Sequence, residues 1–150
     1  NARLMAGVYA SRGLSALVFR GANTGLDELT TTDANQVWLV SGGAVVETEF
    51  DARESLGMAS SSIEDLAGGE ASENAAVARD VLSGGGADAV RDAVALNVGA
   101  GILAWEGLDN PVTRADFEPR MRGAVERALA ALADGSGARL VERWVAASNA

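Results

Sequence analysis

Two adjacent carboxylates, Asp27 and Glu28, follow the apolar run of residues 15–19 in a segment rich in turn-forming residues. Mg²⁺ prefers oxygen ligands and takes one or two carboxylates together with water and substrate phosphate oxygens. Gly21 and Gly25 precede the pair and allow the backbone to approach a ligand closely. The dipeptide alone leaves two interpretations open, a divalent metal site and an ordinary solvated acidic loop.

Asn97 and the segment of residues 68–74 are further candidates for binding chemistry. Asn97 interrupts an otherwise apolar helix face, and we expect its amide to satisfy a buried backbone group. The Gly-rich turn before Glu70 has the geometry that often receives an anion at a helix N-terminus. Glu70 and Glu73 already place negative charge there, so we predict a helix cap instead of a phosphate site.

The composition excludes several kinds of chemistry. The 150 residues include 12 basic and 21 acidic side chains, a formal net charge of −9, no His and no Cys, and every basic residue is Arg. A lysine Schiff base, a histidine general base, a thiol nucleophile and a cysteine-based zinc site are therefore impossible within this sequence. The acidic balance disfavours nucleic-acid binding, and no apolar run reaches the roughly 20 residues that span a membrane. We expect a cytoplasmic protein.

The elements that must position the carboxylate pair alternate as in an α/β domain. Residues 15–19 are typical of a buried strand, and residues 36–40 and 44–50 predict a β-hairpin across residues 41–43. In open α/β sheets, ligands bind beyond the carboxyl ends of the strands, which here means near Gly21. We predict a mixed sheet flanked by helices, with further strands outside this sequence, and we interpret the chain as a fragment that begins inside a helix.

Helices are predicted to end near residue 12 and to cover residues 73–82, 88–105, about 113–132 and the segment after residue 137. Capping boxes are predicted at residues 62–65 and 113–116. The apolar stripes assigned to these helices are Leu4, Met5, Val8 and Tyr9 in the first, Val90, Val94, Val98, Ile102 and Trp105 in the third, and Phe117, Met121, Val125, Leu129 and Leu132 in the fourth. We expect the last helix to bury Leu140, Val141, Trp144 and Val145.

Four segments can be compared with a known family. They are residues 16–21 (Ala-Leu-Val-Phe-Arg-Gly), 25–32 (Gly-Leu-Asp-Glu-Leu-Thr-Thr-Thr), 66–76 (Leu-Ala-Gly-Gly-Glu-Ala-Ser-Glu-Asn-Ala-Ala) and 90–97 (Val-Arg-Asp-Ala-Val-Ala-Leu-Asn). In residues, order and spacing they resemble the anthranilate phosphoribosyltransferase family, over essentially the whole chain. The resemblance implies that residues 1–150 are the C-terminal part of an α/β domain of the nucleoside phosphorylase and phosphoribosyltransferase type.

The resemblance implies transfer of the phosphoribosyl group of phosphoribosyl pyrophosphate to the amine of anthranilate, with release of pyrophosphate, in tryptophan biosynthesis. It implies that Asp27 and Glu28 hold Mg²⁺ against the diphosphate, and that the complete enzyme is a homodimer. The family's pyrophosphate loop and N-terminal helical domain have no counterpart here, so we expect this chain alone to be inactive. The comparison assigns no catalytic residue and leaves the substrate-binding residues unknown.

Arg20 is a local departure from the family, which usually has histidine before this glycine. Arginine keeps a hydrogen-bond donor but is permanently charged and cannot act as a base. Three functions stay open: a Mg²⁺-dependent anthranilate phosphoribosyltransferase, a non-catalytic or diverged relative that acts as a binding module, and a related nucleoside phosphorylase. The Leu-Asp-Glu-Leu context of residues 26–29 argues against the last.

Overall fold

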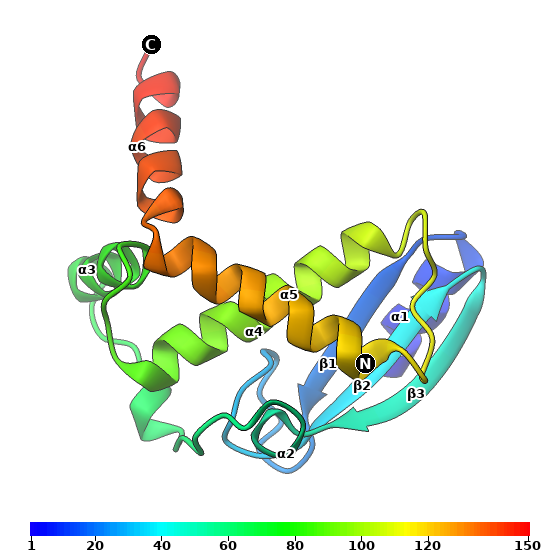
Figure 1. Cartoon of the computed structure of the whole chain (residues 1–150). Coiled ribbons are helices and arrows are strands. Elements are labelled where there is room, and N and C mark those ends of the chain that lie inside the picture. The colour runs from blue at the N-terminus through cyan, green and yellow to red at the C-terminus, as the bar shows by residue number, and fades with distance from the viewer.

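The computed structural model describes residues 1–150 and places a three-stranded sheet between helices (Figure 1). In chain order the elements are α1 (Ala2–Ser11), β1 (Ala16–Gly21), β2 (Asn35–Ser41), β3 (Ala44–Phe50), α2 (Ala52–Leu56), the 3-10 helix η1 (Glu64–Leu66), α3 (Ala71–Leu82), α4 (Asp88–Glu106), α5 (Phe117–Ala133) and α6 (Ser136–Ser148). The predicted α/β class, with a sheet flanked by helices, is confirmed. None of the helices combines the length and apolarity needed to cross a membrane.

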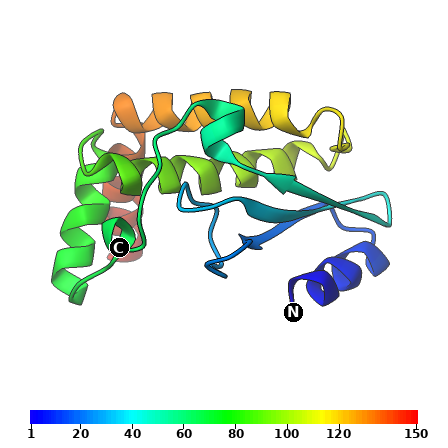
Figure 2. The same ribbon diagram turned by 90° about the horizontal axis from the view of Figure 1, so that it is seen from below.

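The central strand, β2, is buried on both faces. It pairs antiparallel with β1 on one side and with β3 on the other. Val37 and Leu39 point into the main core. Trp38 and Val40 contact α1 on the opposite face, as the two-residue period of a strand requires. Figure 2 shows the resulting layers, with α1 on one side of the sheet and α4 and α5 on the other.

The predicted hairpin is confirmed as β2 and β3. Its turn consists of Gly42 and Gly43, whose φ angles of 57° and 78° suit a two-residue type I′ turn. The sheet differs in one respect from the mixed sheet that we predicted, because every strand pair in these residues is antiparallel. The loop of residues 22–34 returns the chain from β1 to β2 without a crossover helix, and this connection makes the two strands antiparallel.

Helices α4 and α5 pack against each other over the main core. In α5, the predicted stripe is confirmed, with Leu129 partly buried and the others buried. The buried residues of α4 are Ala95, Leu96, Gly99, Ala100 and Leu103. The prediction that Val98 and Trp105 lie on the buried face is therefore wrong, since both are exposed. A Cβ at Gly99 would lie 2.8 Å from Val125 Cγ2, so small residues on α4 allow α5 to approach closely.

The outer helices expose most of the apolar faces that the sequence assigned to them. Only Ala6 and Ala10 of α1 are buried, and α6 has no buried residue and projects from the end of α5 (Figure 1). Amphipathic spacing identifies an apolar helix face but not whether another element covers it, which is why the prediction that the last helix buries its apolar residues is wrong. The exposed residues are Leu4, Met5 and Val8 in α1 and Leu140, Trp144 and Val145 in α6.

Candidate metal-binding loop

The predicted carboxylate pair lies on the loop of residues 22–34, which follows β1. Asp27 and Glu28 are both exposed, and neither takes part in an ion pair. Asp27 lines a hollow of about 700 Å³ bordered by residues of α1 and β1. The structure thus places the pair beyond the carboxyl end of β1, where the sequence predicts it, with both carboxylates accessible.

Asn97 of α4 holds the loop immediately after the pair. Its Oδ1 accepts a hydrogen bond from the Leu29 N–H at 3.1 Å, and its Nδ2 donates to the Leu29 carbonyl at 2.9 Å. Nδ2 also donates to the Ala93 carbonyl at 2.8 Å, which fixes the orientation of the amide. Leu29 is only 1% exposed, so its backbone needs these partners. The prediction that Asn97 satisfies a buried backbone group is confirmed.

Asp33 holds the loop before the pair. Its Oδ2 accepts the N–H groups of Asn23 and Thr24 at 2.6 and 3.0 Å, and its Oδ1 accepts the hydroxyls of Thr24 and Thr32 at 3.2 and 3.3 Å. Burial raises the pKa of Asp33, but these hydrogen bonds outweigh burial and keep the pKa below its usual value. Hydrogen bonds from the loop therefore engage both oxygens of the ionised Asp33 carboxylate.

Asn35 and Gly21 complete the framework of the loop. Asn35 is fully buried at the start of β2, and its Nδ2 donates to the carbonyls of Thr30 and Asp33 at 3.1 and 3.3 Å. A Cβ at Gly21 would lie 2.2 Å from Thr24 Oγ1, so glycine is required where the loop folds back. The sequence reasoning missed Asp33 and Asn35. Both could have been found from the sequence, because Asp and Asn in a turn-rich segment just before a strand commonly hydrogen-bond nearby backbone groups.

The open arrangement of the pair determines what it can hold. No group of three or more His, Cys, Asp or Glu side chains is close enough together to hold a metal ion, so the chain builds no site from protein ligands alone. Mg²⁺ needs only one or two carboxylates when waters and phosphate oxygens supply its other ligands. Two exposed carboxylates on a loop that is held at both ends fit this requirement.

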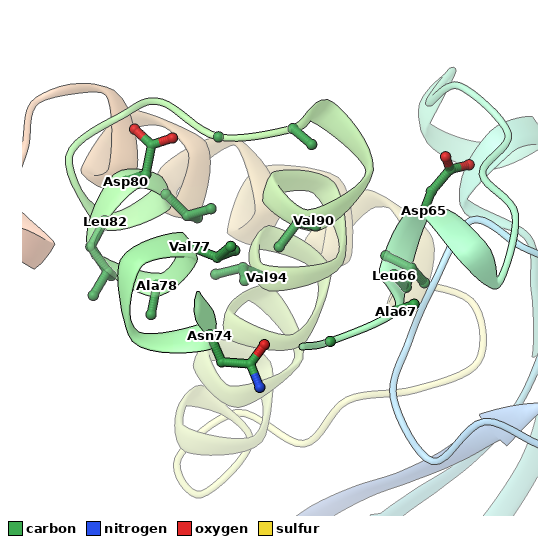
Figure 3. A pocket seen from close by; sticks show the side chains of 14 residues that line it. Asp65, Leu66, Ala67, Asn74, Val77, Ala78, Asp80, Leu82, Val90 and Val94 are labelled. Atoms are coloured by element: carbon green, nitrogen blue, oxygen red, sulfur yellow. The ribbon is translucent and has the colours of Figure 1, made fainter. Parts of the chain in front are cut away.

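A separate apolar cavity of about 610 Å³ lies between α3, α4 and the segment that contains Leu66 (Figure 3). Val77 of α3 and Val90 and Val94 of α4 contribute to its mainly hydrophobic lining. Neither carboxylate of the candidate metal pair lines this cavity.

The predicted cap at the N-terminus of α3 is confirmed. Glu73 Oε2 accepts the N–H of Glu70 at 2.8 Å. The Asn74 amide accepts the N–H of Gly69 at 2.8 Å and donates to its carbonyl at 2.9 Å. The chain's own side chains therefore occupy these two backbone donors. Both predicted capping boxes, at residues 62–65 and 113–116, also form.

Comparison with known proteins identifies a family and several relatives. The family model described as glycosyl transferase family, a/b domain, matches residues 2–138. The anthranilate phosphoribosyltransferases of Arthrobacter sp. strain FB24 and Nocardia farcinica are 48% and 46% identical to this chain over 145 and 149 residues, and each match covers 97% of the chain. The chain spans only 39% and 42% of the length of these two relatives.

Solved structures share the fold. Anthranilate phosphoribosyltransferase from Thermus thermophilus has a TM-score of 0.80 at 33% identity, covering 99% of this chain and 40% of that chain. The Saccharomyces cerevisiae enzyme in complex with PRPP and Mg has a TM-score of 0.69 at 18% identity, covering 85% of this chain and 33% of that chain. The arrangement of helices and sheet described above is therefore found in these larger proteins.

Proposed function

Because this chain belongs to the glycosyl transferase family with the a/b domain, we propose that it is the C-terminal part of the α/β domain of an anthranilate phosphoribosyltransferase. The proposed reaction transfers phosphoribose from phosphoribosyl pyrophosphate to the amine of anthranilate, with release of pyrophosphate, in tryptophan biosynthesis. The observation that carries this proposal is the accessible Asp27–Glu28 pair, on a loop that Asn97 and Asp33 hold on either side of it.

In this proposal Asp27 and Glu28 hold Mg²⁺ against the diphosphate of the substrate. Bound Mg²⁺ would neutralise the charge that grows on the departing pyrophosphate as the ribose carbon becomes cationic. The chain requires such help because its net charge is −9 and it has neither Lys nor His, so by itself it repels a polyanion. Further positive charge would come from segments of the family that have no counterpart in these residues.

Arg20 lies beside the same hollow as Asp27. Its Nε donates to the carbonyl of Gly21 at 3.3 Å, and its guanidinium provides a fixed positive charge that cannot act as a base. This residue is the specific reason to keep a second candidate function, a diverged relative with another acceptor or a non-catalytic binding module. The family resemblance further supports a cytoplasmic homodimer whose dimer contacts lie outside residues 1–150.

Neutralising the acidic pair tests the metal role. In Asp27→Asn/Glu28→Gln, the Mg²⁺ affinity of the complete enzyme in the presence of phosphoribosyl pyrophosphate, measured by calorimetry, should fall at least about 10-fold, a loss that even changes outside the ligand shell produce. The control Asp109→Asn/Glu118→Gln removes the same charge from two exposed positions and should leave Mg²⁺ binding unchanged. Identical Mg²⁺ uptake after neutralisation of Asp27 and Glu28 would end the metal proposal.

The activity itself is tested with the complete enzyme. Asp27→Asn and Glu28→Gln should each lower the rate of phosphoribosyl transfer to anthranilate, most strongly at limiting Mg²⁺, because less metal is bound. The 150-residue chain alone should show no transfer, and robust transfer by it would contradict the proposal. A complete protein that responds neither to Mg²⁺ nor to phosphoribosyl pyrophosphate would favour the binding module.

A further inference from the structure

We propose that Asn97 is a positioning residue for the Asp27–Glu28 pair, an inference that rests on the proposed function. Asn97 lies on α4, 68 residues away in the sequence from Leu29, which directly follows the pair. Its side-chain amide bonds both the N–H and the carbonyl of Leu29. The Asn97 amide therefore bonds Leu29 at two points, as the backbone of a neighbouring strand would in a sheet.

The two bonds fix the direction of the chain at the pair. The Leu29 N–H belongs to the peptide group that also contains the Glu28 carbonyl, so a hydrogen bond of 3.1 Å to Asn97 Oδ1 restricts the plane of that peptide. The third bond, from Asn97 Nδ2 to the Ala93 carbonyl at 2.8 Å, ties the amide to the helix. Rotation of the amide would break all three bonds.

Asp27 and Glu28 therefore stand between two fixed points. On the side before them, Asp33 holds the N–H groups of Asn23 and Thr24, and on the side after them Asn97 holds Leu29. The carboxylates themselves are exposed and in no ion pair, so within the chain only the backbone sets the positions from which they reach a metal ion. Groups that hydrogen-bond metal ligands directly typically contribute about 10-fold to 100-fold to metal affinity, and Asn97, which acts through the backbone, should contribute at the lower end of that range.

A purely structural role would also explain the bonds to Leu29, because buried backbone groups need partners. The chain provides a matched control for that alternative. Asn74 bonds the N–H and the carbonyl of Gly69 at 2.8 and 2.9 Å in the same two-point manner, but it holds the turn before α3. Loss of either amide should disturb a loop, whereas only loss of the Asn97 amide should affect metal binding.

The experiment is a titration of the ¹⁵N-labelled complete enzyme with Mn²⁺, a paramagnetic substitute for Mg²⁺, in the presence of phosphoribosyl pyrophosphate, followed by broadening of the amide signals of residues 26–29. In Asn97→Ala the Mn²⁺ affinity should fall about 10-fold, while Asn74→Ala should bind Mn²⁺ like the wild type. Urea unfolding of both variants measures how much stability each change removes. A selective loss of affinity in Asn97→Ala supports the positioning role.

A second variant tests the inference if Asn97→Ala does not fold. Asn97→Ser can bond the carbonyl one turn earlier in α4, but its short side chain cannot reach both backbone groups of Leu29, so it should also weaken Mn²⁺ binding. Wild-type affinity in either folded Asn97 variant would overturn this inference and leave the metal pair standing. Absence of Mn²⁺ broadening at residues 26–29 of the wild type would overturn the metal site and the inference together.

Discussion

Asp33 makes the stability of the candidate metal loop depend on pH. Its pKa in the folded chain is below the ordinary value of about 3.9 for an unfolded chain, so its stabilising contribution is complete above that value and is lost as the pH falls through the folded pKa. Asp33→Asn should lower the free energy of unfolding at pH 7 by about 1–3 kcal/mol, because the side-chain amide presents N–H groups to the loop's donors.

Urea unfolding of wild type and Asp33→Asn between pH 7 and pH 2 checks this expectation. The difference between the two proteins should shrink toward the acidic end, as the pH falls toward the lowered pKa of Asp33 in the folded chain. Asp109→Asn, at an exposed position, serves as the control with little effect at any pH. A difference for Asp33→Asn that stays constant over the whole range would contradict the ionised role of this carboxylate.

Single residues of the loop were predictable only in part. An apolar run and two glycines mark the end of β1, and this is enough to place Asp27 and Glu28 beyond the strand. An amide on an apolar helix face indicates that Asn97 has a buried partner. The identity of that partner could not be predicted, because Leu29 is brought to Asn97 by the packing of α4 and not by any local pattern.

At the scale of elements, the contact between α4 and α5 depends on Gly99. A Cβ at this position would lie 2.8 Å from Val125 Cγ2 and 3.2 Å from the Val125 nitrogen. Gly99→Ala should therefore lower the free energy of unfolding by about 1–3 kcal/mol, the usual effect of overpacking. Gly101→Ala is the matched control on the same helix, because a Cβ there meets nothing within 4 Å.

The control should instead be more stable than the wild type by about 0.5–1 kcal/mol, since alanine favours a helix over glycine. Urea unfolding followed by circular dichroism measures both variants. Equal effects of the two substitutions would show that helix propensity, and not the close approach of α5, decides the outcome.

Elements were easier to predict than the faces they bury. Gly42 and Gly43 specify the hairpin turn by their own conformational freedom, and the α5 stripe matches the core because α4 packs against that face. The buried face of α4 is formed mostly by small residues, so hydrophobicity alone favours its valines. The antiparallel pairing of β1 could not be predicted either. The sequence of the loop after β1 does not indicate the direction in which the chain returns to the sheet.

At the scale of the whole molecule, the exposure of the three tryptophans shows which faces of the helices and the sheet are covered. Trp38 is 5% exposed between the sheet and α1, whereas Trp105 and Trp144 are 75% and 72% exposed. Acrylamide, a neutral quencher that the net charge of −9 does not exclude, should quench the fluorescence of the two exposed residues. The variant Trp105→Phe/Trp144→Phe, which keeps only Trp38, should resist quenching.

Quenching of Trp38→Phe gives the complementary result, because only exposed tryptophans remain. Full accessibility in that variant agrees with an α6 that projects into solvent. A protected fraction would mean that α6 or the end of α4 is covered in solution. The sequence did not reveal that this face of α6 is exposed, because an amphipathic helix has the same pattern whether or not another element covers its apolar face.

The position of β2 has a consequence for cooperativity. This strand contributes buried side chains to both cores, Val37 and Leu39 on one face and Trp38 and Val40 on the other. Detachment of α1 would expose one face of the strand to water and weaken the layer on which α4 rests, so both cores should unfold together, as small domains usually do. Asn35 begins the same strand and donates a hydrogen bond to the Thr30 carbonyl in the candidate metal loop. Loosening of α1 from the sheet would thus be transmitted through β2 to the two carboxylates.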